Sequence, residues 1–322
     1  MSAAAIAAAP AAGADFYSVQ AANRRRSAVL ILVFTLAVVA LGGAIDVLCD
    51  GYLQADGERL PFMSLGALAL AAASAAVAYV RGAQLVLASL HATPLDPANP
   101  EHRQLFNIVT EMALASGLPC PQLYVIPDLA PNALSAGRDP YHAVLVVTAG
   151  LLNLLDREEM QGVVAHEMGH IANRDTLTMT LVSVLLGGAL LLADGGRRAV
   201  YLGRAERRRS LLAYLIMLLA IAVTPVLSRV LAMAVSRQRE YLADATAVQL
   251  TRNPLGLASA LEKIGMATSP LRDASSGTAH LFIANPWPRA LESRDGWLAD
   301  LLSTHPPVAQ RIAVLHAMAH TG

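Results

Sequence analysis

The apolar positions near the start of the chain fall into two nearly unbroken runs, at residues 28–45 and 61–80. A helix needs about 20 consecutive apolar residues to cross a bilayer, so the pattern predicts two N-terminal transmembrane helices. Three arginines at 24–26 precede the first run, as basic residues also precede the apolar part of a signal peptide. The run is long for such a peptide, however, and a second run follows after a short loop, which favours an anchored hairpin.

The charges around these two runs indicate the orientation of the hairpin. The arginines at 24–26 and Arg81 flank its two ends, whereas the loop between the runs carries Asp50, Asp56 and Glu58 against Arg59. Because cytoplasmic flanks of transmembrane helices are enriched in Lys and Arg, both ends are expected to face the cytoplasm. Everything after the hairpin then begins on the cytoplasmic side.

After a proline-containing linker at 91–100 the pattern becomes that of a globular domain. Apolar residues recur at helical spacing in 101–116, and a longer helical stretch covers about 156–175. Short runs rich in β-branched residues at 123–126 and 143–148 are typical of strands. The predicted fold class is therefore mainly α with a small β-sheet.

Two further apolar runs, at 177–193 and 211–227, are short for transmembrane helices and are joined by an arginine-rich loop. If both runs cross the membrane, these arginines lie outside, against the positive-inside tendency. A shallow or tilted hairpin, or arginines bound to lipid headgroups, would also fit. The predicted organisation is a flexible tail at 1–26, a transmembrane hairpin at 27–81, a cytoplasmic domain formed by 82–176 and 236–322, and an inserted membrane-associated or transmembrane hairpin at 177–235.

The composition supports a membrane protein and excludes one class of partner. Hydrophobic residues make up 55% and charged residues 15% of the chain, and the mean hydropathy is +0.47. The 24 basic residues balance the 24 acidic ones, which argues against a nucleic-acid-binding protein. Cys49 and Cys120, the two cysteines, are expected on opposite sides of the membrane and so cannot pair.

The sequence His166-Glu167-Met168-Gly169-His170 lies within the longer helical stretch. Helix geometry puts the two histidines one turn apart on one face, where two imidazoles can bind one zinc ion. Glu167 then lies beside the ion as a general base for the attacking water. The alternative, a helix whose two histidines are ordinary surface or core residues, is already the less favoured interpretation of the motif alone.

A catalytic zinc also needs a third protein ligand, and Glu240 is the best candidate. Asp244 follows it by one helical turn and could accept a hydrogen bond from a ligand histidine. An ordinary acidic pair on a solvated helix face is the alternative, and composition alone favours it. Distance along the helices favours the ligand: His170 and Glu240 lie roughly 10 and 20 Å from the ends of the central apolar runs, so a hairpin brings them to similar heights.

His305 precedes two prolines and could be held rigidly enough to donate a hydrogen bond to an oxyanion. A turn with an exposed histidine is the simpler interpretation of these residues.

Several separated motifs together resemble the HtpX-like family of membrane zinc proteases, which is related to the CaaX prenyl proteases. They occur in the family's order between residues 15 and 312: PNALSAGR at 131–138, AHEMGHIANRD at 165–175, SRQREYLAD at 236–244, LFIANP at 281–286 and STHPP at 303–307. The chain departs from the family at Leu134 and Ser135, where Phe-Ala is more usual, and in its alanine-rich tail and basic 197–209 loop.

The resemblance implies a zinc endopeptidase of the bacterial plasma (inner) membrane, facing the cytoplasm, that cuts misfolded or damaged membrane proteins. The roles that it implies are one Zn²⁺ per chain bound by His166, His170 and Glu240, Glu167 as catalytic base, His305 and Arg311 beside the scissile carbonyl, and substrate binding along an edge strand by Asn132, Ala133, Leu134 and Ser135.

Two alternatives remain open on the sequence. An intramembrane zinc protease would also use the two histidines, but charged residues bracket this motif and would be costly in hydrocarbon. A non-catalytic zinc-binding scaffold would have no need of the Glu167 carboxylate.

Overall fold

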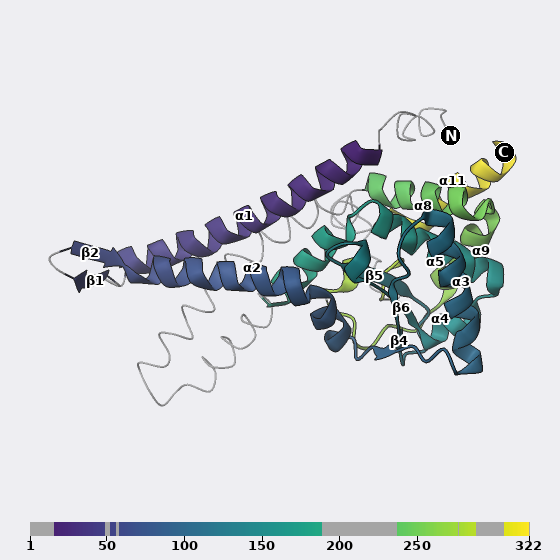
Figure 1. Ribbon diagram of the computed structural model, residues 1–322, viewed down its shortest axis with the longest axis horizontal. Helices are drawn as coiled ribbons and strands as arrows, with labels where there is room; N and C mark the ends of the chain where they lie inside the picture. The colour runs from purple at the N-terminus through teal and green to yellow at the C-terminus, as the bar shows by residue number, and fades with distance from the viewer. Residues whose placement is uncertain are drawn as a thin grey trace.

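Two long helices lie side by side and form an arm that projects from a globular body (Figure 1). The computed structural model describes residues 16–48, 52–55, 58–188, 237–275, 277–287 and 306–321. The arm consists of α1 (Phe16–Leu48) and α2 (Phe62–Ser89). A two-stranded antiparallel ribbon of β1 (Tyr52–Ala55) and β2 (Glu58–Pro61) joins them at the outer end, where the sequence predicted a loop.

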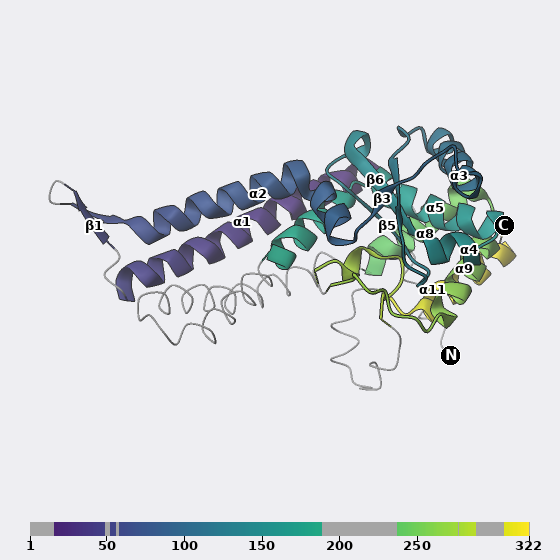
Figure 2. The ribbon, with the colours of Figure 1, turned by 90° about the horizontal axis from the view of Figure 1, so that it is seen from below.

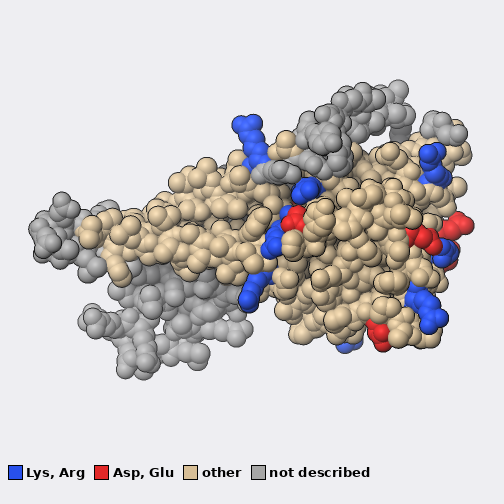
Figure 3. Space-filling view, in the orientation of Figure 1, with Lys and Arg blue, Asp and Glu red and all other residues tan. Residues whose placement is uncertain are grey.

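The arm exposes many large apolar side chains. In the part of the chain that the structure describes, one helix, Ser64–Ser89 within α2, is long and apolar enough to cross a membrane. The predicted run 28–45 lies within α1, whose Val29, Leu32 and Leu36 are about half exposed. On the face shown in Figure 3, charged side chains gather on the body and where the arm meets it. The crossing of α1 stays a prediction.

A four-stranded mixed sheet in the order β3-β4-β6-β5 forms the centre of the body. The strands are β3 (Thr93–Pro94), β4 (Gln122–Ile126), β5 (Ala133–Gly137) and β6 (Ala143–Thr148). β4 and β6 are parallel, whereas the other two pairs are antiparallel. The predicted strands at 123–126 and 143–148 are confirmed as β4 and β6, and β5 is at one edge.

Alternate residues of the sheet enter two different cores, as the period of a strand requires. Leu145 and Val147 of β6 pack with α3 (Pro100–Ser116) and with the other helices of the body. Val144 and Val146 pack on the opposite face with α1, α2 and the apolar helix Thr176–Gly188. The sheet is therefore covered by body helices on one face and by the base of the arm on the other (Figure 2).

Five further helices complete the described part of the body. They are α4 (Ala149–Leu154), α5 (Arg157–Ala172), α8 (Arg237–Thr251), α9 (Pro254–Met266) and α11 (Val308–Thr321), together with the short 3-10 turns η2 (Pro140–His142) and η3 (Ala279–Leu281). The predicted class, mainly α with a small sheet, is confirmed. Of the predicted central hairpin, residues 189–235 lie outside the described residues, as do residues 1–15 of the tail.

The start of α5 and its crossing with α8 fix the region that carries the histidines. Asp156 caps α5 by accepting from the backbone of Glu159, whose side chain accepts from the backbone of Asp156 in return. Near the other end, α8 passes so close to Gly169 that a Cβ there would lie 3.2 Å from Thr246 Cβ and 3.3 Å from Ala243 Cα. Glycine at this position therefore lets the backbones of α5 and α8 approach closely.

Candidate metal centre

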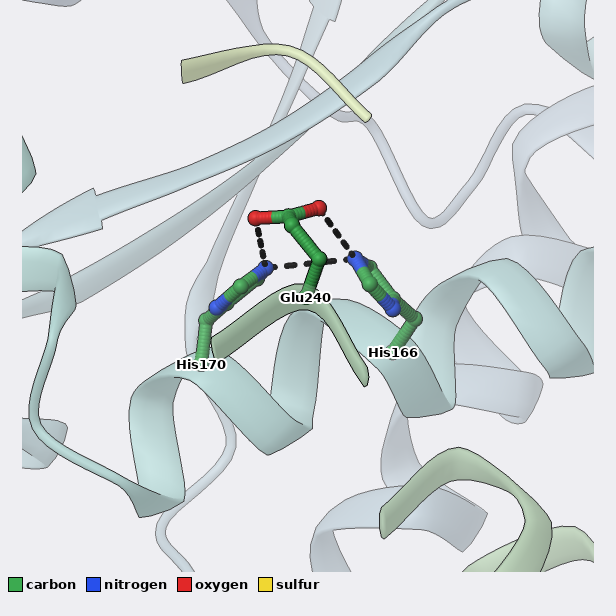
Figure 4. Close-up of side chains that lie close together, drawn as sticks. All are labelled: His166, His170 and Glu240. Carbon is green, nitrogen blue, oxygen red and sulfur yellow. Dashed lines mark hydrogen bonds and ion pairs between the residues drawn. The ribbon is translucent and has the colours of Figure 1, made fainter. Parts of the chain in front are cut away.

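Two histidines and one glutamate converge between α5 and α8 (Figure 4). His166 and His170 lie one turn apart on α5, and Glu240 lies in the first turn of α8. The two Nε2 atoms are 3.2 Å apart, and the Glu240 carboxylate oxygens lie 3.7 Å from His170 Nε2 and 3.8 Å from His166 Nε2. The three predicted ligands are thus together, and at least one potential ligand atom of each lies within 4.8 Å of the others.

The spacing of these atoms fits a zinc ion. Zinc binds imidazole nitrogen and carboxylate oxygen at about 2.0–2.1 Å in a tetrahedral arrangement, which separates neighbouring ligand atoms by about 3.3 Å. The observed separations of 3.2, 3.7 and 3.8 Å need only small side-chain movements to reach that value. Two imidazoles and one carboxylate also leave a fourth position open, as a catalytic zinc requires.

The balance of buried charge around the cluster also fits a divalent cation. Four carboxylates that are at most 2% exposed surround it, whereas two buried guanidinium groups face them. They are Glu167, Asp175, Glu240 and Asp244 against Arg239 and Arg311, which gives a net charge of −2 when both imidazoles are neutral, as metal ligands have to be. Unbalanced buried charge is costly, and an ion of charge +2 would neutralise it.

Each of the two histidines has a carboxylate on the far side of its ring. His166 Nδ1 lies 2.9 Å from Asp244 Oδ1, and His170 Nδ1 lies 3.1 Å from Asp175 Oδ2. A carboxylate at Nδ1 holds the proton there and leaves the Nε2 lone pair for a metal. Asp244 was predicted for this role, but Asp175 was missed, because it reaches His170 through a turn in which Arg174 has φ of 57°.

The carboxylates around His170 change its ionisation strongly. Burial by itself lowers the pKa of the imidazole, but Asp175, Glu240 and Glu167 outweigh it and raise the pKa of His170 to about 9. A metal ion that binds Nε2 therefore has to displace a proton at neutral pH. It follows that metal affinity should weaken as the pH falls below 9.

Arg311 lies behind His166, fully buried, and supports Asp244. Its Nε and Nη2 donate to the two oxygens of Asp244 at 2.9 and 2.6 Å, and Nη1 donates to the Ile283 carbonyl oxygen at 3.0 Å. Burial alone raises the pKa of the Asp244 carboxyl, but Arg311 and His166 lower it below its usual value. Arg311 is thus hydrogen-bonded to both carboxylate oxygens of Asp244. His305, the other residue expected beside the scissile carbonyl, lies outside the described residues.

Glu167 is buried next to the cluster and is held by β5. Its Oε2 accepts a hydrogen bond of 2.6 Å from Ser135 Oγ. Within the described residues, Glu167 Oε1 has no hydrogen-bond partner. A cavity of about 10 Å³ lies between Glu167, His170, Glu240 and β5, which is room for about one water molecule.

The four predicted substrate-binding residues divide into two groups. Asn132, Ala133 and Leu134 contact a segment of the chain itself: Asn132 Nδ2 donates to the Ala284 carbonyl at 3.0 Å, the Ala133 carbonyl accepts from Ile283 N at 2.9 Å, and Leu134 pairs with Phe282. Ser135 instead reaches Glu167. The LFIANP motif therefore pairs with the first half of the β5 edge.

The chain resembles known proteases over most of its length. Residues 99–319 match the profile of Peptidase family M48. A protease HtpX homolog of Caldanaerobacter subterraneus is 40% identical over 309 residues, which cover 94% of this chain and 97% of the relative. One of Tropheryma whipplei is 38% identical over 304 residues, covering 94% and 98%. The crystal structure of Ste24p from S. mikatae matches with a TM-score of 0.45 and 18% identity, covering 77% of this chain and 57% of Ste24p.

Proposed function

The chain belongs to peptidase family M48 and is a metallopeptidase, and on that premise we propose that it is a membrane-bound zinc endopeptidase acting on misfolded or damaged membrane proteins. His166, His170 and Glu240 would hold one zinc ion, and Glu167 would be the catalytic base. The observation that carries the proposal is the convergence of these three side chains beside the buried Glu167, which lines a small cavity and whose Oε1 has no hydrogen-bond partner within the described residues.

The side chains divide the work of peptide hydrolysis between them. Zinc, when bound, lowers the pKa of water and polarises a carbonyl group. Glu167 takes the proton of the attacking water through Oε1 and later delivers it to the leaving amine. Asp244 and Asp175 hold the rings of His166 and His170 in the orientation that binds the metal. Arg311 in turn holds Asp244 through two hydrogen bonds.

The position of the cluster favours a protease beside the membrane over an intramembrane one. His166 is on α5 and Glu240 on α8. Both helices lie in the body, and the apolar arm projects away from it (Figure 1). Exposed charged residues at the start of α5, Arg157 and Glu158, also suit water rather than lipid. We propose that the body lies at the cytoplasmic face, where the flanking arginines of the hairpin are expected.

Substrate would bind along β5 as an added strand. Ser135 lies next to the part of the edge that residues 282–284 already occupy. Pairing of a substrate strand with β5 at Ser135 would carry its scissile bond past Glu167. Because the cavity has room for only about one water, entry requires residues 280–283, which line it, to move aside.

Removal and return of zinc tests the proposed function. Purified full-length protein, reconstituted in lipid with a destabilised membrane protein as substrate, should cleave that substrate internally. A chelator should abolish cleavage, and zinc added in slight excess over the remaining chelator should restore it, because the buried site otherwise lacks its electrophile. The measurement is the appearance of internal fragments by mass spectrometry.

Cleavage that persists after complete removal of zinc would contradict the proposal. Zinc-loaded protein that binds the substrate and never cleaves it would instead support the scaffold alternative.

A further inference from the structure

We propose that Ser135 is a positioning residue for the general base: its hydroxyl fixes the Glu167 carboxylate so that Oε1 is aimed at the attacking water. The inference rests on the proposed function and extends it to a residue outside the metal-binding motif. Ser135 thereby links the strand expected to bind substrate with the group that activates water.

The contact between the two side chains is short and buried. Ser135 Oγ lies 2.6 Å from Glu167 Oε2, and the two residues are only 5% and 1% exposed. Hydroxyl-to-carboxylate hydrogen bonds of this length are about twice as strong as neutral ones, and burial protects them from competing water. Ser135 therefore restrains the carboxylate to one orientation.

The register of the sheet explains why Ser135 reaches this carboxylate. Ser135 pairs with Leu145 of β6, and the side chain of Leu145 enters the core that includes Val164 and Met168 of α5. Side chains of directly paired residues lie on the same face of a sheet, so Ser135 also faces α5. Its neighbours Leu134 and Ala136 enter the opposite core. The hydroxyl is thus held by β5 and its register against β6.

The bond leaves the two carboxylate oxygens of Glu167 in different situations. Oε2 accepts the hydrogen bond from Ser135, whereas Oε1 has no hydrogen-bond partner within the described residues. Glu167 is one of the residues that line the cavity. The terminal torsion of a glutamate is otherwise broad and roughly two-fold. Without the hydroxyl, the carboxylate would rotate and present the wrong geometry for part of the time. Because the resembled family more usually has alanine here, we expect a reduced rate rather than complete loss.

The chain contains a second serine–glutamate pair that serves as a matched control. Ser259 Oγ donates to Glu159 Oε1, also at 2.6 Å, and Glu159 lies on the same helix α5 as Glu167. Lys263 Nζ also donates to Glu159 Oε2, at 2.7 Å. None of these three residues lines the cavity. Removing either hydroxyl deletes one serine–carboxylate hydrogen bond, but only Ser135 touches the proposed base.

The test compares Ser135→Ala, Ser135→Thr and Ser259→Ala in the full-length, zinc-loaded enzyme. For Ser135→Ala we expect kcat to fall about tenfold, since small errors in the alignment of reacting groups cost rates of this order. KM should stay within about twofold and zinc at one per chain, because a substrate strand would pair with the backbone of β5, whereas the Ser135 side chain contacts Glu167. Ser135→Thr, which keeps the hydroxyl, should recover most of kcat, and Ser259→Ala should leave kcat unchanged.

Three results would overturn the role of Ser135. They are an unchanged kcat in Ser135→Ala, a loss confined to KM, and an equal loss of kcat in the alanine and threonine variants with zinc retained. Failure of the proposed function looks different: in that case wild-type protein does not cleave, or Glu167→Gln cleaves as well as wild type.

Discussion

Replacement of Glu167 by Gln should leave one zinc per chain and reduce kcat by about 10²- to 10⁴-fold, which is the contribution expected of a general base. Glutamine has the same shape and can still hydrogen-bond to Ser135 Oγ, so the fold around His166 and His170 should persist. It cannot, however, take a proton at Oε1. The measurements are zinc content and the rate of cleavage of the reconstituted substrate in the same preparation.

Glu159→Gln is the matched control for this variant. Glu159 is on the same helix and also accepts a serine hydroxyl at 2.6 Å, but it lies at the capped start of α5. This variant should lose some thermal stability, because it weakens the contact between Glu159 and Lys263. It should keep kcat, because Glu159 does not line the cavity. Undiminished cleavage by Glu167→Gln would exclude Glu167 as the base.

Replacement of Arg311 by Met should lower the free energy of unfolding by about 3–5 kcal/mol, the usual cost of removing one partner of a buried ion pair. Asp244 is 1% exposed and would lose both of its hydrogen bonds from the guanidinium. In the wild type the guanidinium lies close to both Asp244 and Glu240. Without it, these two buried carboxylates would repel each other more strongly. We expect a melting temperature lower by roughly 10 °C and a lower zinc occupancy, because His166 is held by Asp244.

Arg157→Met separates the effect of burial from that of losing an arginine. Arg157 Nη2 also donates to both oxygens of a carboxylate, Glu111, at 2.6 and 2.8 Å, but the two side chains are 51% and 45% exposed. Exposed ion pairs contribute about 0–1 kcal/mol, so this variant should melt close to wild type and keep its zinc. Equal stability losses in the two variants would show that the buried Arg311–Asp244 pair contributes no more to stability than the exposed Arg157–Glu111 pair.

The parts of the site that sequence predicts well are those fixed by local geometry. His166 and His170 are one helical turn apart whatever surrounds them, and the apolar spacing around them indicates a helix. The strands β4 and β6 are recognisable because their β-branched residues form short, bounded runs. In each case the interacting residues are close together in the chain.

The role of Glu240 can be predicted only in part from the sequence. Composition favoured an ordinary acidic pair with Asp244, and the argument from helix length depended on residues 211–227, which lie outside the described residues. The structure brings Glu240 to the histidines through the close packing of α8 on α5 at Gly169. A glycine that is needed for a helix crossing cannot be distinguished in the sequence from any other glycine.

The remaining contacts depend on long-range geometry that the sequence does not specify. Asp175 reaches His170 through a left-handed residue, Arg174, which no turn motif indicates. The bond from Ser135 to Glu167 depends on the register of β5 against β6. Pairing of Phe282 with Leu134 joins two segments that lie far apart in the sequence. Such contacts follow from the packing of whole elements rather than from any short pattern.

X-ray absorption at the zinc edge of the purified protein tests the central claim most directly, with Glu240→Ala measured beside the wild type. We expect one zinc per chain with nitrogen and oxygen ligands at about 2.0–2.1 Å, an imidazole signal from two histidines, and loss of the ion or of its carboxylate ligand in Glu240→Ala. A sulfur ligand at about 2.3 Å, or an identical spectrum with full zinc in Glu240→Ala, would contradict the assignment of His166, His170 and Glu240 as the metal site.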